Sequence, residues 1–141
     1  GDRVMAASPL CRVLLVEHDP DIRAIACFAL RSVGGLSVEA CASGSEAIAK
    51  AKHFLPELVL LDVMMPEMDG PETLRALRGL PQAAAIPIVF MTARVQPHEI
   101  EEYRRAGACD VILKPFDASQ LPELLQEIWS RIHGEAERRP A

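Results

Sequence analysis

Polar side chains that could do chemistry follow apolar segments of this chain, and Asp62 is the most informative of them. Leu58 to Leu61 form a continuous apolar run that ends at the Asp62 carboxylate, a pattern typical of a strand buried on both faces of a parallel sheet. Two methionines, a proline and the turn dipeptide Asp69-Gly70 follow. Such a strand delivers its acid to the edge where open α/β sheets bind ligands. On this segment alone, Asp62 could also be a residue that only caps a turn.

The pattern of an apolar strand followed by a helix recurs along the chain. Apolar segments predict strands over 11–16, 36–42, 58–62, 86–91 and 109–113. Helical spacing predicts helices over 20–33, 43–55, about 70–80, 97–105 and 121–132. Because right-handed βαβ units give a parallel sheet, we predict an α/β, flavodoxin-like, doubly wound fold with strand order 2-1-3-4-5. The predicted domain spans 10–133, and 1–9 and 134–141 are predicted to be flexible tails.

The predicted strand order brings several of these polar side chains to one crevice. The first strand delivers Glu17 and His18, the third Asp62, the fourth Thr92, and the fifth Lys114. In the 2-1-3-4-5 order these four strands are consecutive neighbours, so two acids, an imidazole, a hydroxyl and an ammonium converge. Each residue alone has a simpler explanation: Thr92 as a helix cap, Lys114 as a solvated loop charge, Glu17 as a turn acid. Their coincidence favours a functional site.

Composition narrows the functional classes. The chain has 141 residues, 50% hydrophobic and 25% charged, with a net charge of −5 and no basic block. Direct nucleic-acid binding is therefore not expected. No run is long and apolar enough for a membrane span, so we expect no membrane partner and a cytoplasmic location. The four cysteines lack CxxC spacing, which favours small buried hydrophobes in a reducing compartment over a disulfide or metal role.

The segments LLVEHDP, LVLLDVMMPEMDG, VFMTA and ILKPF resemble the receiver domain of two-component response regulators, of the chemotaxis-regulator-like kind. The resemblance covers 11–132, and it includes the intervals from Asp62 to Thr92 and from Thr92 to Lys114. It implies that Asp62 accepts a phosphoryl group from a histidine kinase or a histidine phosphotransfer protein. Thr92 and Lys114 would then contact phosphoryl oxygens.

The resemblance also implies a Mg²⁺ cofactor and a cis peptide bond before Pro115. Glu17, Asp62 and the backbone carbonyl of Met64 would hold the ion. His18 stands where the family usually has a second acid, so either His18 contacts the metal or its imidazole only lines the pocket. An imidazole would weaken Mg²⁺ binding and make Mn²⁺ possible.

Two further positions bear on how this chain would work. Val111 stands where the family commonly places an aromatic switch residue, so the usual coupled motion of hydroxyl and ring cannot operate in that form. Met64 and Arg94 resemble positions that tune hydrolysis of the acyl phosphate in the family.

Three functional hypotheses follow. The leading one is a phosphoryl-accepting switch that is not an enzyme, although it may hydrolyse its own acyl phosphate. Its output partner would bind the face formed by 97–105, 109–113 and the last helix, and a homodimer is possible. The second is a pseudo-receiver that signals without phosphorylation because His18 weakens the metal site. The third, a phosphatase with an Asp nucleophile, lacks a second acid because Met64 stands at that position.

Overall fold

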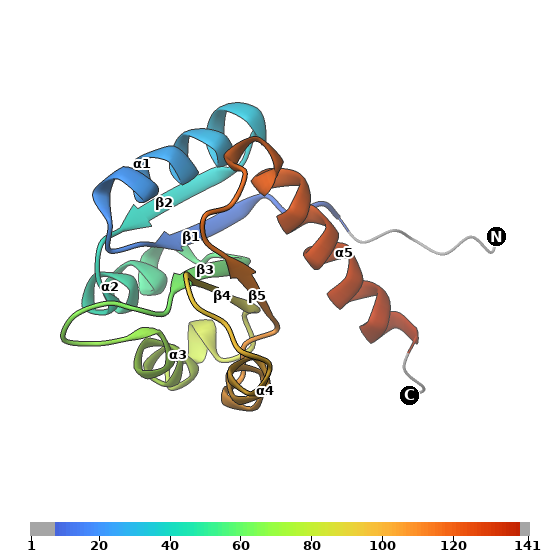
Figure 1. The fold of residues 1–141 in the computed structure, drawn as a ribbon. Helices are drawn as coiled ribbons and strands as arrows, with labels where there is room; N and C mark the ends of the chain where they lie inside the picture. Colours follow the sequence, from blue (N-terminus) through green and yellow to red (C-terminus); the bar gives the residue numbers. More distant parts are fainter. Residues whose placement is uncertain (1–7, 139–141) are drawn as a thin grey trace.

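The computed structural model describes residues 8–138, and its centre is a five-stranded parallel sheet in the order β2-β1-β3-β4-β5 (Figure 1). The strands are β1 (Arg12–Val16), β2 (Ser37–Cys41), β3 (Leu58–Asp62), β4 (Ile88–Thr92) and β5 (Asp110–Leu113). The fold class and the strand order predicted from the sequence are therefore confirmed.

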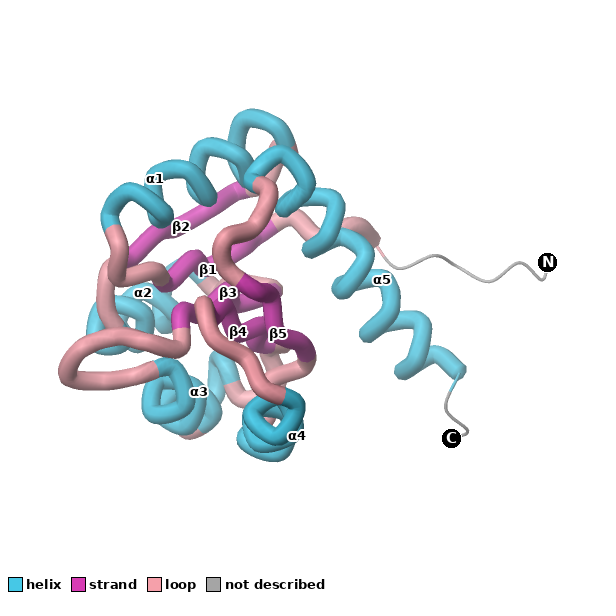
Figure 2. The backbone as a smooth tube through the Cα atoms, viewed as in Figure 1, coloured by secondary structure: helices cyan, strands magenta, loops and turns pink. Residues whose placement is uncertain are grey.

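Helices cover both faces of the sheet (Figure 2). The α-helices are α1 (Pro20–Phe28), α2 (Gly44–Phe54), α3 (Gly70–Arg78), α4 (Pro97–Ala106) and α5 (Leu121–Arg138). α1 and α5 lie over one face, where Ala26, Leu125 and Ile128 pack against the strands. α2, α3 and α4 lie over the other face, where Ala47 and Leu74 belong to a second core cluster. The two clusters explain why the central strands are apolar on both sides.

The register of the central strands aligns the residues that end them. Every residue of β3 and β4 is buried, as a continuous apolar run predicts. Asp62 pairs with Met91, and Thr92 pairs with Leu113 one position further along. Parallel pairing therefore places the carboxyl ends of β3, β4 and β5 at the same edge of the sheet.

Side-chain caps set the points where the loops at this edge become helices. Asp19 accepts hydrogen bonds from the first turn of α1, and Pro20 occupies a first-turn position that needs no N–H donor. Ser43 caps α2. Asp69 and Glu72 form a reciprocal capping box at the start of α3. The loops that follow β1 and β3 are thereby held at both ends.

The first predicted helix differs from expectation near its end. The helix predicted up to Val33 is an α-helix to Phe28, followed by a π-helix, Ala29–Val33. The Gly34 N–H donates to the Ala29 carbonyl, five residues earlier. A Cβ on Gly34 would lie 2.7 Å from the Pro122 Cβ, so this end of the helix approaches α5 closely. Apolar spacing predicts a helix here but does not report such a local widening.

Two other element boundaries differ from the predicted ones by two residues. α3 ends at Arg78, so Leu80 lies beyond the helix, just before the short 3₁₀ turn Pro81–Ala83. β4 begins at Ile88, two residues later than predicted, because Pro87 has no N–H with which to join the ladder.

At its C-terminal end α5 continues through Gly134 to Arg138, beyond the predicted domain limit at residue 133. Of the predicted flexible tails, residues 1–7 and 139–141 lie outside the described residues. Their flexibility stays a prediction.

The cysteines occupy mixed environments and all four are free thiols. Cys41 is buried, and burial raises the pKa of its thiol to about 12. Burial likewise raises the pKa of the half-buried Cys109 to about 11. Cys11 is exposed, so the expectation of buried cysteines fails there, just before β1 begins.

Gly70, the first residue of α3, packs directly against the backbone that follows Asp62. A Cβ at this position would lie 2.8 Å from the Val63 Cα and 2.9 Å from the Asp62 carbonyl oxygen. Because backbone atoms cannot swing aside, we expect Gly70→Ala to lower the free energy of unfolding by about 1–3 kcal/mol. Urea unfolding followed by circular dichroism measures this loss.

Gly79 provides the matched control, because a Cβ there would make only ordinary contacts and its φ of −79° suits alanine. Gly79→Ala should leave the stability unchanged or raise it by about 0.4–1 kcal/mol. Equal stability losses in the two variants would contradict the close approach at Gly70.

Candidate functional site

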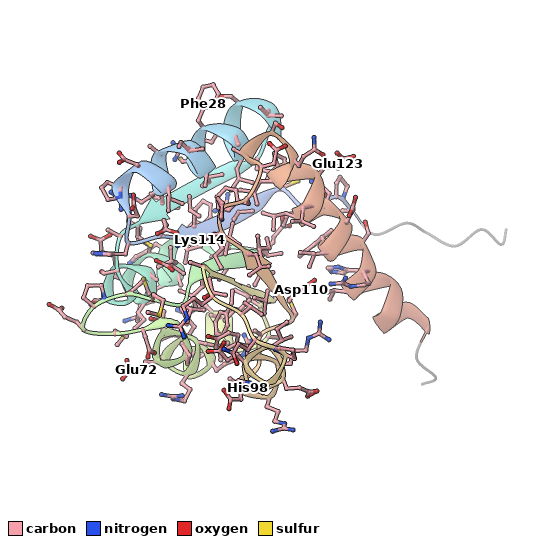
Figure 3. The ribbon with its side chains drawn as sticks, in the orientation of Figure 1. Phe28, Glu72, His98, Asp110, Lys114 and Glu123 are labelled. Atoms are coloured by element: carbon pink, nitrogen blue, oxygen red, sulfur yellow. The ribbon has the colours of Figure 1, made fainter. Side chains whose placement is uncertain are left out.

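Side chains from three strand ends meet in one cleft at the carboxyl edge of the sheet. Glu17 follows β1, Asp62 ends β3, and Lys114 follows β5 and is labelled in Figure 3. The cleft has a volume of about 380 Å³ and is lined by Glu17, His18, Asp19, Ile22, Asp62, Met64, Ala93, Lys114 and Pro115. Five of the predicted site residues, Glu17, His18, Asp62, Met64 and Lys114, therefore lie together.

The Lys114 ammonium joins the two acids of the cleft. Its Nζ lies 2.7 Å from Glu17 Oε1 and 3.0 Å from Asp62 Oδ1. The carboxylate-bearing side chains are almost completely buried, with exposed fractions of 1% and 3%. Two buried like charges repel strongly, so the ammonium is the counter-charge that allows both to lie here. The contact with Glu17 is an ion pair rather than a well-directed hydrogen bond, so Oε1 keeps unused acceptor capacity.

This arrangement shifts the pKa values of Glu17 and Lys114. Burial raises the pKa of Glu17, and the Lys114 ammonium and the Asp19 backbone N–H only partly offset this rise. Burial lowers the pKa of Lys114, but the neighbouring carboxylates of Glu17 and Asp62 outweigh that effect and leave the pKa raised. Lys114 therefore remains a cation at neutral pH.

Backbone N–H groups orient the Asp62 carboxylate. The Met64 N–H donates to Oδ1, and the His18 N–H donates to Oδ2, each at 3.3 Å. The role predicted for His18 involved only its imidazole, whereas its contact with Asp62 comes from its backbone. Its side chain lines the cleft, but the residue as a whole is exposed. Whether the imidazole contacts a metal stays a prediction.

Two residues to which the sequence pattern assigned no role in the site, Asp19 and Arg23, hold the acidic loop after β1. The Asp19 N–H donates to Glu17 Oε2 at 2.9 Å. The guanidinium of Arg23, one turn into α1, donates to the carbonyls of Glu17 and His18 at 2.9 and 3.3 Å. The cap signal at Asp19 was visible in the sequence, but a polar residue on a helix gives no sign of the carbonyl it will reach.

Thr92 ends β4 at the same edge but bonds within its own loop. Its hydroxyl donates to the Arg94 carbonyl at 3.1 Å and accepts from the Arg94 N–H at 3.3 Å. The residue is buried, with 2% exposed. The Arg94 side chain is exposed next to this loop. Thr92 is therefore near the cleft with a hydroxyl already satisfied by backbone groups.

The donor set of the cleft is small, but its oxygens are of the kind that a divalent cation binds. Within residues 8–138, no three His, Cys, Asp or Glu side chains are grouped so as to hold a metal ion. The cleft does offer the buried Glu17 Oε1 with spare acceptor capacity, the Asp62 carboxylate and the Met64 backbone. Mg²⁺ accepts such sites because it keeps several waters and needs only one or two carboxylates. The residues present fit Mg²⁺ as a hydrated ion.

Two other expectations concern the end of β5. The Lys114–Pro115 peptide bond is cis, as the resemblance implied. Val111 lies half-buried in β5 and pairs with Phe90 of β4, so no aromatic side chain occupies that position.

Comparison with known proteins defines the class. The model of the response regulator receiver domain family matches residues 13–126, and the chain belongs to this family. Phosphorylation and Mg²⁺ binding are general features of the family, whose members are generally signalling modules rather than enzymes and interact with histidine kinases and output partners.

Individual relatives agree with this assignment. The chain is 32% identical over 137 residues to a probable C4-dicarboxylate response regulator, DctR, of Halalkalibacterium halodurans, covering 94% of this chain and 59% of that protein. It is 35% identical over 120 residues to response regulator Rre1 of Synechocystis, covering 84% of this chain and 52% of the relative. The chain thus spans little more than half the length of these two curated relatives. The structure of chemotaxis protein CheY4 of Vibrio cholerae matches with a TM-score of 0.79 and 33% identity, covering 84% of this chain and 98% of that one.

No helix among residues 8–138 is both long enough and apolar enough to span a membrane.

The ion pairs of Lys114 generate a stability prediction. Lys114→Met keeps the length of the side chain but leaves Glu17 and Asp62 as buried like charges. We expect the free energy of unfolding at pH 7 to fall by about 3–5 kcal/mol, the usual cost of removing one partner of a buried ion pair. In an Asp62→Asn background the loss should be smaller, because only one carboxylate then lacks its counter-charge. Urea unfolding of the four proteins measures both values.

Lys50→Met is the control for this substitution, since Lys50 pairs with Glu39 at 3.3 Å and the two side chains are partly exposed, at 38% and 43%. Its loss should not exceed about 1 kcal/mol. Similar losses at positions 50 and 114 would show that the cleft does not depend on the ammonium.

Proposed function

We propose that this protein is a phosphoryl-accepting receiver, phosphorylated on Asp62 by a histidine kinase or a histidine phosphotransfer protein. The observation that carries the proposal is the buried Asp62 carboxylate held against the Lys114 ammonium in an open cleft at the carboxyl edge of the sheet. A carboxylate with a fixed orientation and access to solvent is a suitable nucleophile toward phosphorus.

The proposed reaction is a direct transfer. An Asp62 oxygen attacks phosphorus, a P–O bond forms, and the P–N bond to the donor imidazole breaks, so the electron pair leaves with the histidine nitrogen. With acetyl phosphate the bond that breaks is the P–O bond to acetate. Lys114 would stabilise charge on one phosphoryl oxygen, and the Thr92 hydroxyl would donate to another after leaving the Arg94 carbonyl.

Mg²⁺ would be held by Glu17, Asp62 and the Met64 backbone carbonyl, and it would supply positive charge to the phosphoryl oxygens. The Glu17 oxygen that has spare acceptor capacity is the same atom that pairs with Lys114. Metal binding would therefore compete with, or redistribute, an existing ion pair. With His18 in place of an acid, we propose that Mg²⁺ binding is weak and that Mn²⁺ binds more tightly.

The output of the switch is proposed to be a change of partner at the face made by α4, β5 and α5. The matched relatives include a DNA-binding response regulator, MtrA of Mycolicibacterium smegmatis, of which this chain spans 46%. Nucleic-acid binding is not proposed for the chain itself, because its net charge is −5. A cytoplasmic location and a possible homodimer complete the proposal.

A pseudo-receiver remains the second candidate. The observation that favours it is that the described residues hold no group of three metal-ligating side chains. In that function the fold would present the same faces to partners without any phosphoryl transfer.

Phosphorylation is tested by intact-mass analysis after treatment with acetyl phosphate and divalent metal. We expect a mass increase of one phosphoryl group in the native chain and none in Asp62→Asn, because Asp62 is the carboxylate that ends the buried strand β3 inside the cleft.

Asp69→Asn is the matched control, since Asp69 also follows β3 but serves as a helix cap. It should be labelled like the native chain. Labelling of Asp62→Asn would overturn the assignment of the site, and no labelling of the native chain with either Mg²⁺ or Mn²⁺ would favour the pseudo-receiver.

The role of His18 generates a separate prediction about metal affinity. We expect weak Mg²⁺ binding, tighter Mn²⁺ binding, and phosphorylation that needs a high Mg²⁺ concentration. His18→Asp should strengthen Mg²⁺ binding, because it adds a charged oxygen ligand beside Glu17. Isothermal titration calorimetry of both proteins with each metal measures the difference.

His18→Asn is the control, because it removes the imidazole without adding charge. If His18→Asp and the native chain bind Mg²⁺ equally, the side chain at position 18 stands clear of the metal.

A further inference from the structure

Tyr103 of α4 is the one aromatic side chain of that helix, and it is the only tyrosine of the chain. Its ring meets the ring of Phe90 edge-on, with centroids 5.2 Å apart and an interplanar angle of 85°. Phe90 is fully buried in β4, two residues before Thr92. An edge-to-face pair of this kind fixes both the position and the tilt of the outer ring. Tyr103 therefore rests directly on the strand that ends at Thr92.

Tyr103 and Val111 share a neighbour in Phe90. Tyr103 and Val111 pack as half-buried side chains against the same core cluster, and Val111 pairs with Phe90 across the β4–β5 ladder. A large ring at position 111 would have to share this surface with Tyr103. The small valine and the tyrosine on α4 thus form a complementary pair.

The polar end of Tyr103 lies near the groups that would respond to phosphorylation. Tyr103 lines a second cleft, of about 550 Å³, together with Val63, Met64, Met65, Pro66, Asp69 and Pro71 of the loop after β3. Burial and neighbouring acids raise the pKa of its phenol, and the nearby Thr92 side chain partly offsets the rise. Tyr103 thus lies beside the loop that follows Asp62 and packs on Phe90, whose side chain is on the same face of β4 as that of Thr92.

α4 is attached to the sheet through few side chains. None of its ten residues, all of which the structure describes, is buried, and only Glu99, Ile100 and Tyr103 are half-buried. An element with so little buried surface shifts at low cost, so a change at its aromatic contact can alter its position.

We infer that Tyr103 is a positioning residue that couples the Thr92 hydroxyl to the surface of α4, in place of an aromatic side chain at position 111. This inference rests on the proposed function. When the Thr92 hydroxyl turns from the Arg94 carbonyl to a phosphoryl oxygen on Asp62, the surroundings of the Tyr103 phenol change. The ring then adjusts against Phe90, and α4 moves with it. A partner that binds α4 would sense phosphorylation through this contact.

The single tyrosine makes the test specific, because 3-fluorotyrosine incorporation gives one ¹⁹F resonance. The spectrum is recorded before and after acetyl phosphate treatment with divalent metal, on samples whose intact mass is measured. We expect the resonance to shift on phosphorylation of the native chain and to stay in place in Asp62→Asn. In the unphosphorylated protein, Thr92→Val should also shift it, and Thr92→Ser should shift it less because the hydroxyl is kept.

Tyr103→Phe separates the coupling from simple packing, since it keeps the ring against Phe90 and removes only the hydroxyl. This variant should accept the phosphoryl group as the native chain does, but the phosphorylation-dependent changes of the α4 backbone amide shifts should be largely lost. A mass increase without movement of the ¹⁹F resonance, or full α4 changes in Tyr103→Phe, would overturn the inference alone. No mass increase in the native chain would overturn the proposed function and this inference together.

Discussion

The placement of one ammonium between two buried carboxylates is the constraint on which the cleft depends. Glu17 and Asp62 come from strands that lie side by side in the sheet, so parallel pairing alone would bring two negative charges together out of water. Such a pair is unstable without a counter-charge. Lys114 provides it from a strand at the far side of β4, and it thereby ties three strand ends into one electrostatic unit. The backbone donors of His18 and Met64 then fix the direction in which Asp62 faces.

The same unit accounts for the weak metal site proposed here. A divalent cation and Lys114 would share the oxygens of Glu17 and Asp62. With only two carboxylates and a carbonyl as protein ligands, the affinity for the cation would depend strongly on the charge of the neighbouring side chains. In this chain the residue after Glu17 is His18, which donates a hydrogen bond to Asp62 from its backbone N–H. The chemistry that is still well supported by the side chains is the stabilisation of anionic oxygens by Lys114. That is the part of phosphoryl transfer that needs a fixed positive charge.

The region around Phe90 shows how a substitution in one element can be matched by a residue of another. Val111 of β5 is small, and Tyr103 of α4 supplies an aromatic ring that packs on the neighbouring Phe90 of β4 and against the same core cluster as Val111. The aromatic group is therefore carried by a helix that has no buried residue of its own, rather than by a strand of the sheet. A ring on a lightly attached helix can move that helix directly, whereas a ring on a strand must act on its neighbours. With the aromatic side chain on α4, the surface that would respond to phosphorylation is that of α4 itself.

The sequence by itself determined the fold class, the strand order and the edge at which Glu17, Asp62, Thr92 and Lys114 gather. Strand burial and alternation with helices are local patterns, and the carboxyl ends of parallel strands necessarily share one edge. Local patterns did not reveal the π-helical end of the first helix, because it accompanies a close approach to Pro122 of α5. They also did not reveal that the Thr92 hydroxyl bonds to Arg94, or that Tyr103 lies against Phe90. Lys114 and Asp62 are 52 positions apart, and only the folded backbone decides which oxygens such a side chain can reach. Residue types and spacing thus specify which groups arrive at the site, whereas tertiary packing decides which atoms touch.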